Sequence, residues 1–130
     1  MEFGIELARE DSPASYLLEC RAELPAVGVE RAVLAAIETG IALEDWRLGE
    51  ARRRWGSVVE AARSEGTAAR RRGWSPRRIA LRIDRLREAV DTILFDGRLP
   101  ADLAALASRR AAKMCALAMV HALRSYWQSA

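Results

Sequence analysis

A regular seam of apolar residues over positions 79–93 is the feature that most constrains how this chain can fold. Its members follow one another at steps of four, three, four and three: Ile79, Ile83, Leu86, Val90 and Ile93. This spacing places them all on one side of an α-helix, which must pack against another element to leave water. A similar seam runs through Leu48, Ala51, Trp55, Val58 and Ala62. The chain is therefore predicted to be all-α.

Two dipeptides give the expected starts of helices. Ser12-Pro13 and Ser75-Pro76 each combine an N-cap residue with a proline at the first helical position, where the missing N–H costs nothing. Pro100 opens a last helix that is expected to run to about Gln128. An earlier helix is expected to end at Pro25.

The middle of the chain is harder to divide. The stretch 64–73, SEGTAARRRG, contains two glycines and little periodicity, so a loop or a frayed helix end is expected there. Gly49 and Gly56 share one helical face and are expected to admit a close neighbouring helix. The chain has 130 residues, of which 51% are hydrophobic, and this is enough to form one hydrophobic core. We predict a single compact bundle of four or five antiparallel helices over residues 12–130, preceded by an N-terminal arm over residues 1–11.

The last helix has an unusual distribution of apolar residues. Leu103, Leu106, Met114 and Leu117 share one face, and beyond Met114 the helix becomes apolar nearly all round. A helix that is apolar on every side is expected to be buried on every side. We therefore predict that it is the central element of the bundle or the contact surface of a homodimer.

Few residues of this chain suit catalysis or metal binding. His121 is the one histidine and is expected to lie in the core or in an interface, because no carboxylate lies one turn away to orient it. Cys20 and Cys115 are isolated, and no Cys/His cluster has metal-ligand spacing. Arg110 could line a pocket for an anionic metabolite or extend its guanidinium to water. We predict no cofactor, no metal and no enzymatic activity; a small-molecule enzyme with an arginine-lined pocket is the third hypothesis.

Charge is distributed unevenly along the chain. Residues 1–50 hold eleven acidic and four basic side chains, a balance of −7, whereas residues 51–130 hold seven acidic and seventeen basic ones, a balance of +10. The arginine-rich region 52–87 would attract phosphates. Its weak resemblance to a helix-turn-helix makes a nucleic-acid-binding regulator the second hypothesis. The expected nucleic-acid or anion contacts are Arg70, Arg71, Arg72, Trp74, Arg77, Arg78 and Arg82.

The same arginines have an alternative role inside the fold. Asp84, Glu88 and Asp91 form an acidic stripe on the helix that begins at Pro76, and a recognition helix would not normally direct three carboxylates outward. Arginines beside an apolar seam can instead cover it and pair with the acidic N-terminal half of the chain. Both interpretations remain open from the sequence.

The order of features is similar to that of the flagellin export chaperones, a family of small helical-bundle proteins. The matching pieces are the arm before Ser12-Pro13, the stretch AAIETG at 35–40 followed by a long helix, and the close LRSYWQSA. The resemblance implies a cytoplasmic bundle that holds another protein before its secretion. The chain differs from that family in its first helix and in its basic middle.

A helical bundle that lacks catalytic groups can bind a partner helix in an apolar groove. The residues expected to contact the partner are Phe3, Ile5, Leu7, Met114 and Met119, although completing the core is the favoured role for each of them taken singly. The leading hypothesis is thus a protein-binding module, a chaperone or an adaptor. The N-terminus has no basic segment followed by an apolar one, and the longest apolar run is too short to span a membrane, so we expect a cytoplasmic protein without membrane contact.

Overall fold

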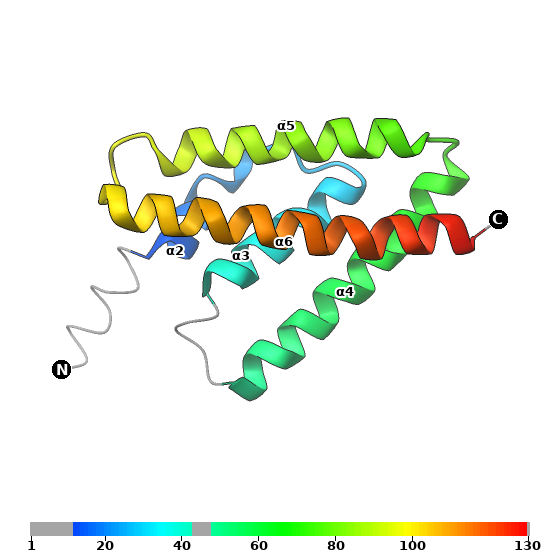
Figure 1. Cartoon of the computed structure of the whole chain (residues 1–130), viewed down its shortest axis with the longest axis horizontal. Helices are drawn as coiled ribbons and strands as arrows, with labels where there is room; N and C mark the ends of the chain where they lie inside the picture. Colours follow the sequence, from blue (N-terminus) through cyan, green and yellow to red (C-terminus); the bar gives the residue numbers. More distant parts are fainter. Residues whose placement is uncertain (1–11, 43–47, 130) are drawn as a thin grey trace.

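The structure, a computed structural model, describes residues 12–42 and 48–129, with the side chains of 48–51 outside that description. Over this part of the chain it consists of helices and contains no strand (Figure 1). The helices are α2 (Pro13–Glu19), the short 3₁₀-helix η1 (Arg21–Glu23), α3 (Val29–Ala42), α4 (Leu48–Arg71), α5 (Pro76–Leu94) and α6 (Ala101–Gln128). The predicted all-α bundle is confirmed.

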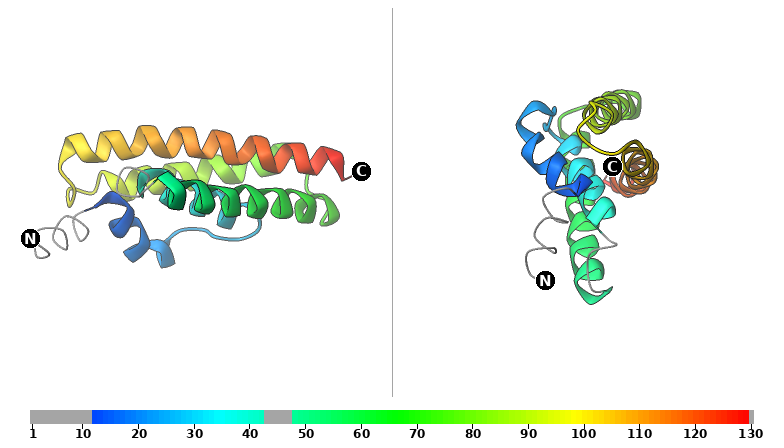
Figure 2. Two further views of the ribbon diagram at one scale, coloured as in Figure 1. Left: turned by 90° about the horizontal axis from the view of Figure 1, so that it is seen from below. Right: turned by 90° about the vertical axis from the view of Figure 1, so that its left-hand side faces the viewer.

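Helix α6 contacts α2, α3, α4 and α5 on one side, and α3, most of whose residues are buried, is the helix that the others enclose. Helices α5 and α6 lie side by side and run antiparallel, joined by the turn over 95–100 (Figures 1 and 2). Helix α4 crosses the other helices obliquely, and its N-terminal part extends away from the bundle (Figure 1). The expected antiparallel packing therefore holds for α5 and α6, whereas α4 departs from it.

Both predicted helix starts are confirmed. The hydroxyl of Ser12 accepts a hydrogen bond from the backbone N–H of Ser15, and that of Ser75 accepts one from Arg78, each at 3.1 Å. The first helix is shorter than expected, because α2 ends at Glu19 and the chain passes through η1 before Pro25. The last helix has the predicted bounds.

The predicted apolar seam of α5 forms the centre of the core. All five of its members are buried: Ile79, Ile83, Leu86, Val90 and Ile93. Leu17 of α2 and Leu34 and Ile37 of α3 are buried with them. On α4 the pattern is sparser. Val58, Ala62 and Ala69 are buried, while Trp55 is partly buried against the core. The helix seams thus gave the correct inward faces of α4 and α5.

The prediction of a loop or a frayed helix end over 64–73 is wrong for most of that stretch, because α4 continues through Gly66 to Arg71. Gly66 lies where α4 crosses α6, and a Cβ added to it would fall 2.8 Å from the carbonyl carbon of Ala122. This glycine therefore permits close helix packing and does not interrupt the helix. The expectation for Gly56 is also wrong, since nothing lies within 4 Å of the position its Cβ would take.

Helix α4 ends sharply at Gly73, which has a φ of +76°. The N–H of Trp74 donates to the carbonyl of Ala69 and that of Gly73 to the carbonyl of Arg70, both at 3.0 Å. This pair of bonds is the Schellman arrangement, in which glycine takes the left-handed conformation after the last helical residue. The break between α4 and α5 is thus a capped junction of four residues, 72–75, in which Ser75 already caps the next helix.

Candidate binding surfaces

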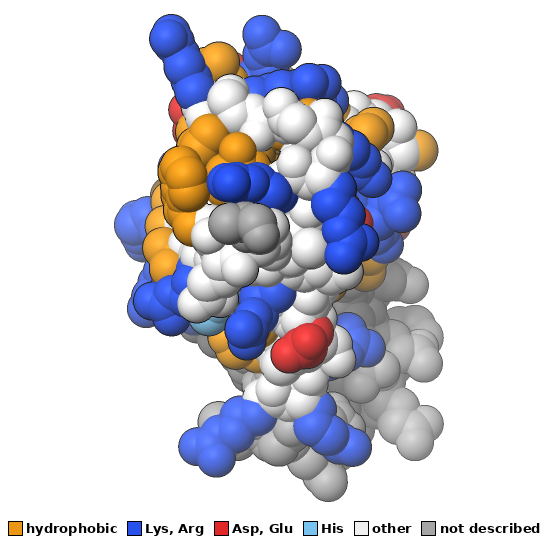
Figure 3. All heavy atoms as spheres, turned by 90° about the vertical axis from the view of Figure 1, so that its right-hand side faces the viewer, with side chains coloured by type: hydrophobic (Ala, Val, Ile, Leu, Met, Phe, Trp, Pro, Cys, Tyr) orange, Lys and Arg blue, Asp and Glu red, His pale blue; other side chains and the backbone are white. Residues whose placement is uncertain are grey.

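Three helix ends meet on one side of the molecule: the end of α4, the start of α5 and the end of α6 (Figure 1). We call the arginines there, Arg70, Arg71, Arg72, Arg77 and Arg78, the basic end. Figure 3 views this side and shows Lys and Arg side chains spread over it, with few acidic ones and with apolar side chains gathered beside them. Five of the seven sequence-predicted anion contacts therefore lie at this end of the molecule.

Several of these arginines contact other parts of the fold. The guanidinium carbon of Arg78 lies 4.3 Å from the centre of the Trp74 ring, and that of Arg70 lies 4.9 Å from the centre of the Tyr126 ring. Arg72 lies 4.0 Å from the carboxylate of Glu65 on the same helix. Such contacts are worth about 1 kcal/mol or less at exposed sites. They orient the arginines along the bundle surface.

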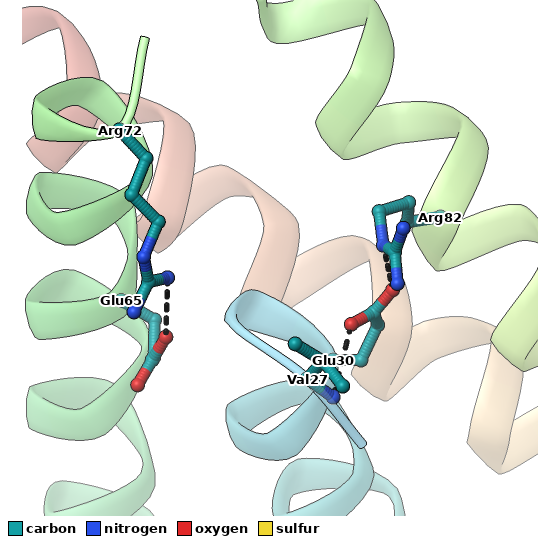
Figure 4. A network of polar contacts seen from close by, with 5 residues as sticks. All are labelled: Val27, Glu30, Glu65, Arg72 and Arg82. Carbon is teal, nitrogen blue, oxygen red and sulfur yellow. Dashed lines mark hydrogen bonds and ion pairs between the residues drawn. The ribbon is translucent and has the colours of Figure 1, made fainter. Parts of the chain in front are cut away.

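Arg82 has a firmer attachment, to the buried carboxylate of Glu30 at the start of α3. Its Nε donates to Oε1 of Glu30, while Oε2 accepts a hydrogen bond from the backbone N–H of Val27 at 3.1 Å (Figure 4). The side chain of Glu30 is 2% exposed, so the pair joins α3 to α5 across the core boundary. One arginine of the predicted anion site therefore pairs with the acidic half of its own chain, as the intramolecular interpretation expected. Arg82 is not available as a nucleic-acid contact in this conformation.

Trp74 does not offer the stacking surface that the sequence suggested. It is only 7% exposed, and its ring packs over Gly28 at the entry to α3. Its carbonyl accepts a hydrogen bond from the hydroxyl of Tyr126 at 2.7 Å, which fixes the α4–α5 junction against the end of α6. The ring is therefore part of the core. Arg71 and Arg77 differ from it: both are exposed and, within the described residues, have no ion pair or ring contact.

Helix α6 packs through a stripe of small side chains. The inner face is formed largely by Ala104, Ala107, Ala111, Ala118 and Ala122, all at most 2% exposed. Met114 is buried on the same side against Gly40 of α3, and Met119 is half-buried. The expectation that Met114 contacts a partner is thus wrong, because its side chain fills a gap between α6 and α3. Phe3, Ile5 and Leu7, the other expected partner contacts, lie outside the described residues.

The opposite side of α6 is exposed in the single chain, so the prediction that α6 is the central element is wrong, while its alternative, a homodimer contact surface, stays a prediction. The apolar members of this side are Leu103, Leu117, Val120 and Trp127, with exposed fractions of 36%, 39%, 50% and 60%. Its basic members, all exposed, are Arg109, Lys113 and Arg124. No acidic residue follows Asp102 along this helix. We call these seven side chains the outer face of α6.

Trp127 connects the outer face of α6 to the basic end. The guanidinium carbon of Arg70 lies 5.7 Å from the centre of its ring, and the ring meets that of Tyr126 edge-on, with centres 5.2 Å apart. Sequence reasoning missed this residue because it lies outside the arginine-rich region and near a helix end. Its place on the apolar and basic side of the helical wheel was the available signal.

The residues considered as candidates for catalysis are hydrogen-bonded to the backbone or at least partly buried within the fold. Arg110 donates a hydrogen bond to the carbonyl of Gly40 at 3.2 Å, near the end of α3. Burial raises the pKa of Cys115 to about 11, which suppresses its thiolate, although nearby Arg87 acts in the opposite direction. His121 is half-buried. Over the described residues no three His, Cys, Asp or Glu side chains come together in a way that could hold a metal ion.

Within residues 12–42 and 48–129, no helix has the length and apolar character needed to cross a bilayer. Comparison of the chain with protein-family models, with curated proteins and with solved structures finds no match. The comparisons therefore neither support nor oppose the resemblance to the flagellin export chaperones.

Proposed function

We propose that this chain is a non-enzymatic protein-binding module, an adaptor or a chaperone, that holds an α-helix of another protein against the outer face of α6. The observation that supports it is the exposure of Leu103, Leu117, Val120 and Trp127 along one helix. Large apolar side chains are usually exposed singly, whereas a row of them along an element marks an interaction site. The remaining exposed ones are scattered over other elements: Leu18, Val27, Leu81 and Phe95.

The physical gain from covering this row is modest, so the contacts around it must contribute to recognition as well. Complete burial of a large apolar side chain contributes about 1.5–3 kcal/mol, and these side chains are already half-covered, so each offers roughly 1 kcal/mol. Trp127, the most exposed of the four, offers the largest contact area. A partner helix would meet the row through residues of its own at steps of three and four.

A binding module accounts for these features better than an enzyme does. Arg110, the residue considered for an anionic substrate, donates to the backbone of Gly40. The two cysteines, Cys20 and Cys115, are unpaired, as is usual in a reducing compartment, so a cytoplasmic location is part of the proposal.

Nucleic-acid binding has weaker support on the same evidence. Trp74 is buried, and Arg82 is bound to Glu30, so the region 52–87 loses its aromatic platform and one of its expected contacts. Arg71 and Arg77 remain exposed. A salt-dependent gel shift with the Arg71→Ala, Arg77→Ala double variant tests this alternative: loss of tight DNA or RNA binding in the variant would favour it over the proposal.

Site-specific photo-crosslinking tests the proposed function. A photoreactive amino acid replaces Val120 on the outer face of α6 or, as a matched control, Leu81, an aliphatic residue on α5 that is 49% exposed. In a native lysate we expect discrete crosslinked proteins from position 120 that are absent from position 81 and that disappear when Leu117→Asp is added. Identical crosslinks from both positions, or none from position 120, would contradict the proposal.

A further inference from the structure

We propose that the helix held on the outer face of α6 is acidic: an amphipathic helix of another protein whose apolar stripe is flanked by carboxylates about three turns apart. This inference rests on the proposed function and adds the chemistry of the partner. It follows from the order of apolar and basic side chains along α6 and from the exposure of those basic side chains, which form no ion pair within the described residues.

On the outer face of α6, two basic residues flank a pair of apolar ones. Lys113, Leu117, Val120 and Arg124 follow one another at steps of four, three and four, which places them along one side of α6. The apolar pair in the middle thus has a cation one turn before it and another one turn after it. The eleven-residue separation of the two cations corresponds to about 16 Å along the helix axis. A helix lying along α6 would meet them with carboxylates at a similar separation.

Within the described residues the cations of this face form no ion pair, and Asp102, in the first turn of α6, is the one carboxylate on the same side of the helix. The three cations, Arg109, Lys113 and Arg124, are all exposed. Arg82, in contrast, is paired with Glu30, so the fold does supply carboxylates where an arginine serves packing. The outer face of α6 retains its positive charge, and a partner with the opposite charge would associate faster and in a defined register.

Charge also separates this occupant from a second copy of the chain. Two outer faces brought together would place Arg109, Lys113 and Arg124 of one copy against the same cations of the other. Like charges across a contact oppose association. The homodimer expected from the apolar character of α6 is therefore disfavoured at this surface.

The depth of the apolar side chains favours a helix over a lipid bilayer or a nucleic acid. Leu103, Leu117 and Val120 are already half-covered by their neighbours, at 36%, 39% and 50% exposed, and only Trp127, at 60%, stands further out, whereas an interfacial helix must insert its apolar face by about 5–10 Å. A nucleic acid would gain base stacking from Trp127 but little from the aliphatic pair at the centre of the face.

Three synthetic helical peptides test the inference. They share one apolar stripe at steps of three and four and differ only in the flanking residues, which are Glu, Gln or Lys. Binding to the full chain is measured by fluorescence anisotropy at low and high salt. We expect the Glu peptide to bind about five- to tenfold more tightly than the Gln peptide, as two exposed ion pairs allow, and the Lys peptide not to bind. Added salt should remove the advantage of the Glu peptide.

A charge reversal in the chain supplies the matching control. In the Lys113→Glu, Arg124→Glu variant the preference should invert, so that the Lys peptide binds better than the Glu peptide. The Arg53→Glu, Arg85→Glu variant changes the net charge equally at exposed positions of α4 and α5 and should keep the original preference. Circular dichroism confirms that each variant is folded.

The outcomes distinguish the two proposals. Equal, salt-independent binding of the Glu and Gln peptides would overturn the acidic partner and leave the proposed function standing. Failure of all three peptides would overturn the acidic partner, and the proposed function would fall with it only if position 120 also gave no crosslink. Tighter binding of single-stranded DNA or phosphatidylserine vesicles than of the Glu peptide, or a dimer in sedimentation that Leu117→Asp abolishes, would overturn the inference in favour of that occupant.

Discussion

Replacement of Gly66 by alanine is the most direct test of how α4 packs on α6. An added Cβ would fall 2.8 Å from the carbonyl carbon and 2.9 Å from the Cα of Ala122. These are backbone atoms of a neighbouring helix, so no side-chain rotation can relieve the overlap, and the two helices must separate. Carbon atoms need about 3.5–4 Å, which requires a displacement on the order of 1 Å.

The cost of that separation can be estimated from the contacts at the crossing. Overpacking of this kind costs about 1–3 kcal/mol. The hydroxyl of Thr67 also lies 2.7 Å from that of Ser125 on α6, and losing this hydrogen bond adds about 1 kcal/mol. The higher helix propensity of alanine offsets about 1 kcal/mol of this loss of stability. We expect Gly66→Ala to lower the free energy of unfolding by about 1–3 kcal/mol and the melting temperature by roughly 5–10 °C.

Gly56→Ala is a matched control in the same helix. Nothing lies within 4 Å of the position its Cβ would take, so only the propensity term remains. This variant should gain about 1 kcal/mol and melt a few degrees higher. Urea and thermal unfolding followed by circular dichroism measure both. If Gly66→Ala were as stabilising as Gly56→Ala, the close crossing of α4 and α6 would be refuted.

Other substitutions test the remaining features. Arg82→Met leaves the buried carboxylate of Glu30 without its cation and should cost about 3–5 kcal/mol in urea unfolding, more than Glu30→Gln, which keeps an acceptor oxygen. Leu117→Ala should change stability by about 0.5 kcal/mol, as for a surface residue; a loss of about 2–5 kcal/mol would place Leu117 in the core and remove it from the binding surface. Cys115, with its pKa raised to about 11, should react with iodoacetamide at neutral pH far more slowly in the folded chain than in urea; equal rates would contradict its burial. Burial raises the pKa of Glu38, so the folded chain holds that proton more tightly and stability falls as pH rises from the ordinary pKa of 4.5 through the raised one; Glu38→Gln should remove this decline in urea titrations.

The parts of the fold that sequence reasoning predicted well are those in which one local signal dominates. The seam of α5 has a residue at every expected step, and its N-terminal Ser75-Pro76 has both the cap and the proline that fix a helix start. The Ser75-Pro76 signal gives the residue at which the helix begins, and the apolar seam gives the face that is buried. The structure agrees with both because nothing in the tertiary packing opposes them.

The region 64–73 was mispredicted because a glycine has two opposite meanings in a helix. Gly66 and Gly73 look equivalent in the sequence, yet the first lies inside α4 against Ala122 and the second ends the helix at a φ of +76°. The difference depends on whether another helix lies a few ångströms away, which is a property of the folded chain. Local propensity therefore could not separate them.

Helix α6 shows why apolar character alone did not identify its outward side. The helix contacts four others, and close approach of helices favours small side chains, so alanines such as Ala118 and Ala122 fill the interior while Leu117 and Val120 remain outside. A hydrophobicity scale ranks leucine above alanine and so assigns the larger residues to the core. Side-chain size gives the correct assignment. A face of alanines indicates the side on which neighbouring helices approach closely, so the larger leucine and valine side chains lie on the opposite side, where no helix of the described residues packs. The exposed leucine and valine thus follow from the close packing of the alanine face of α6 on its neighbours, and the basic residues among them keep that surface in water.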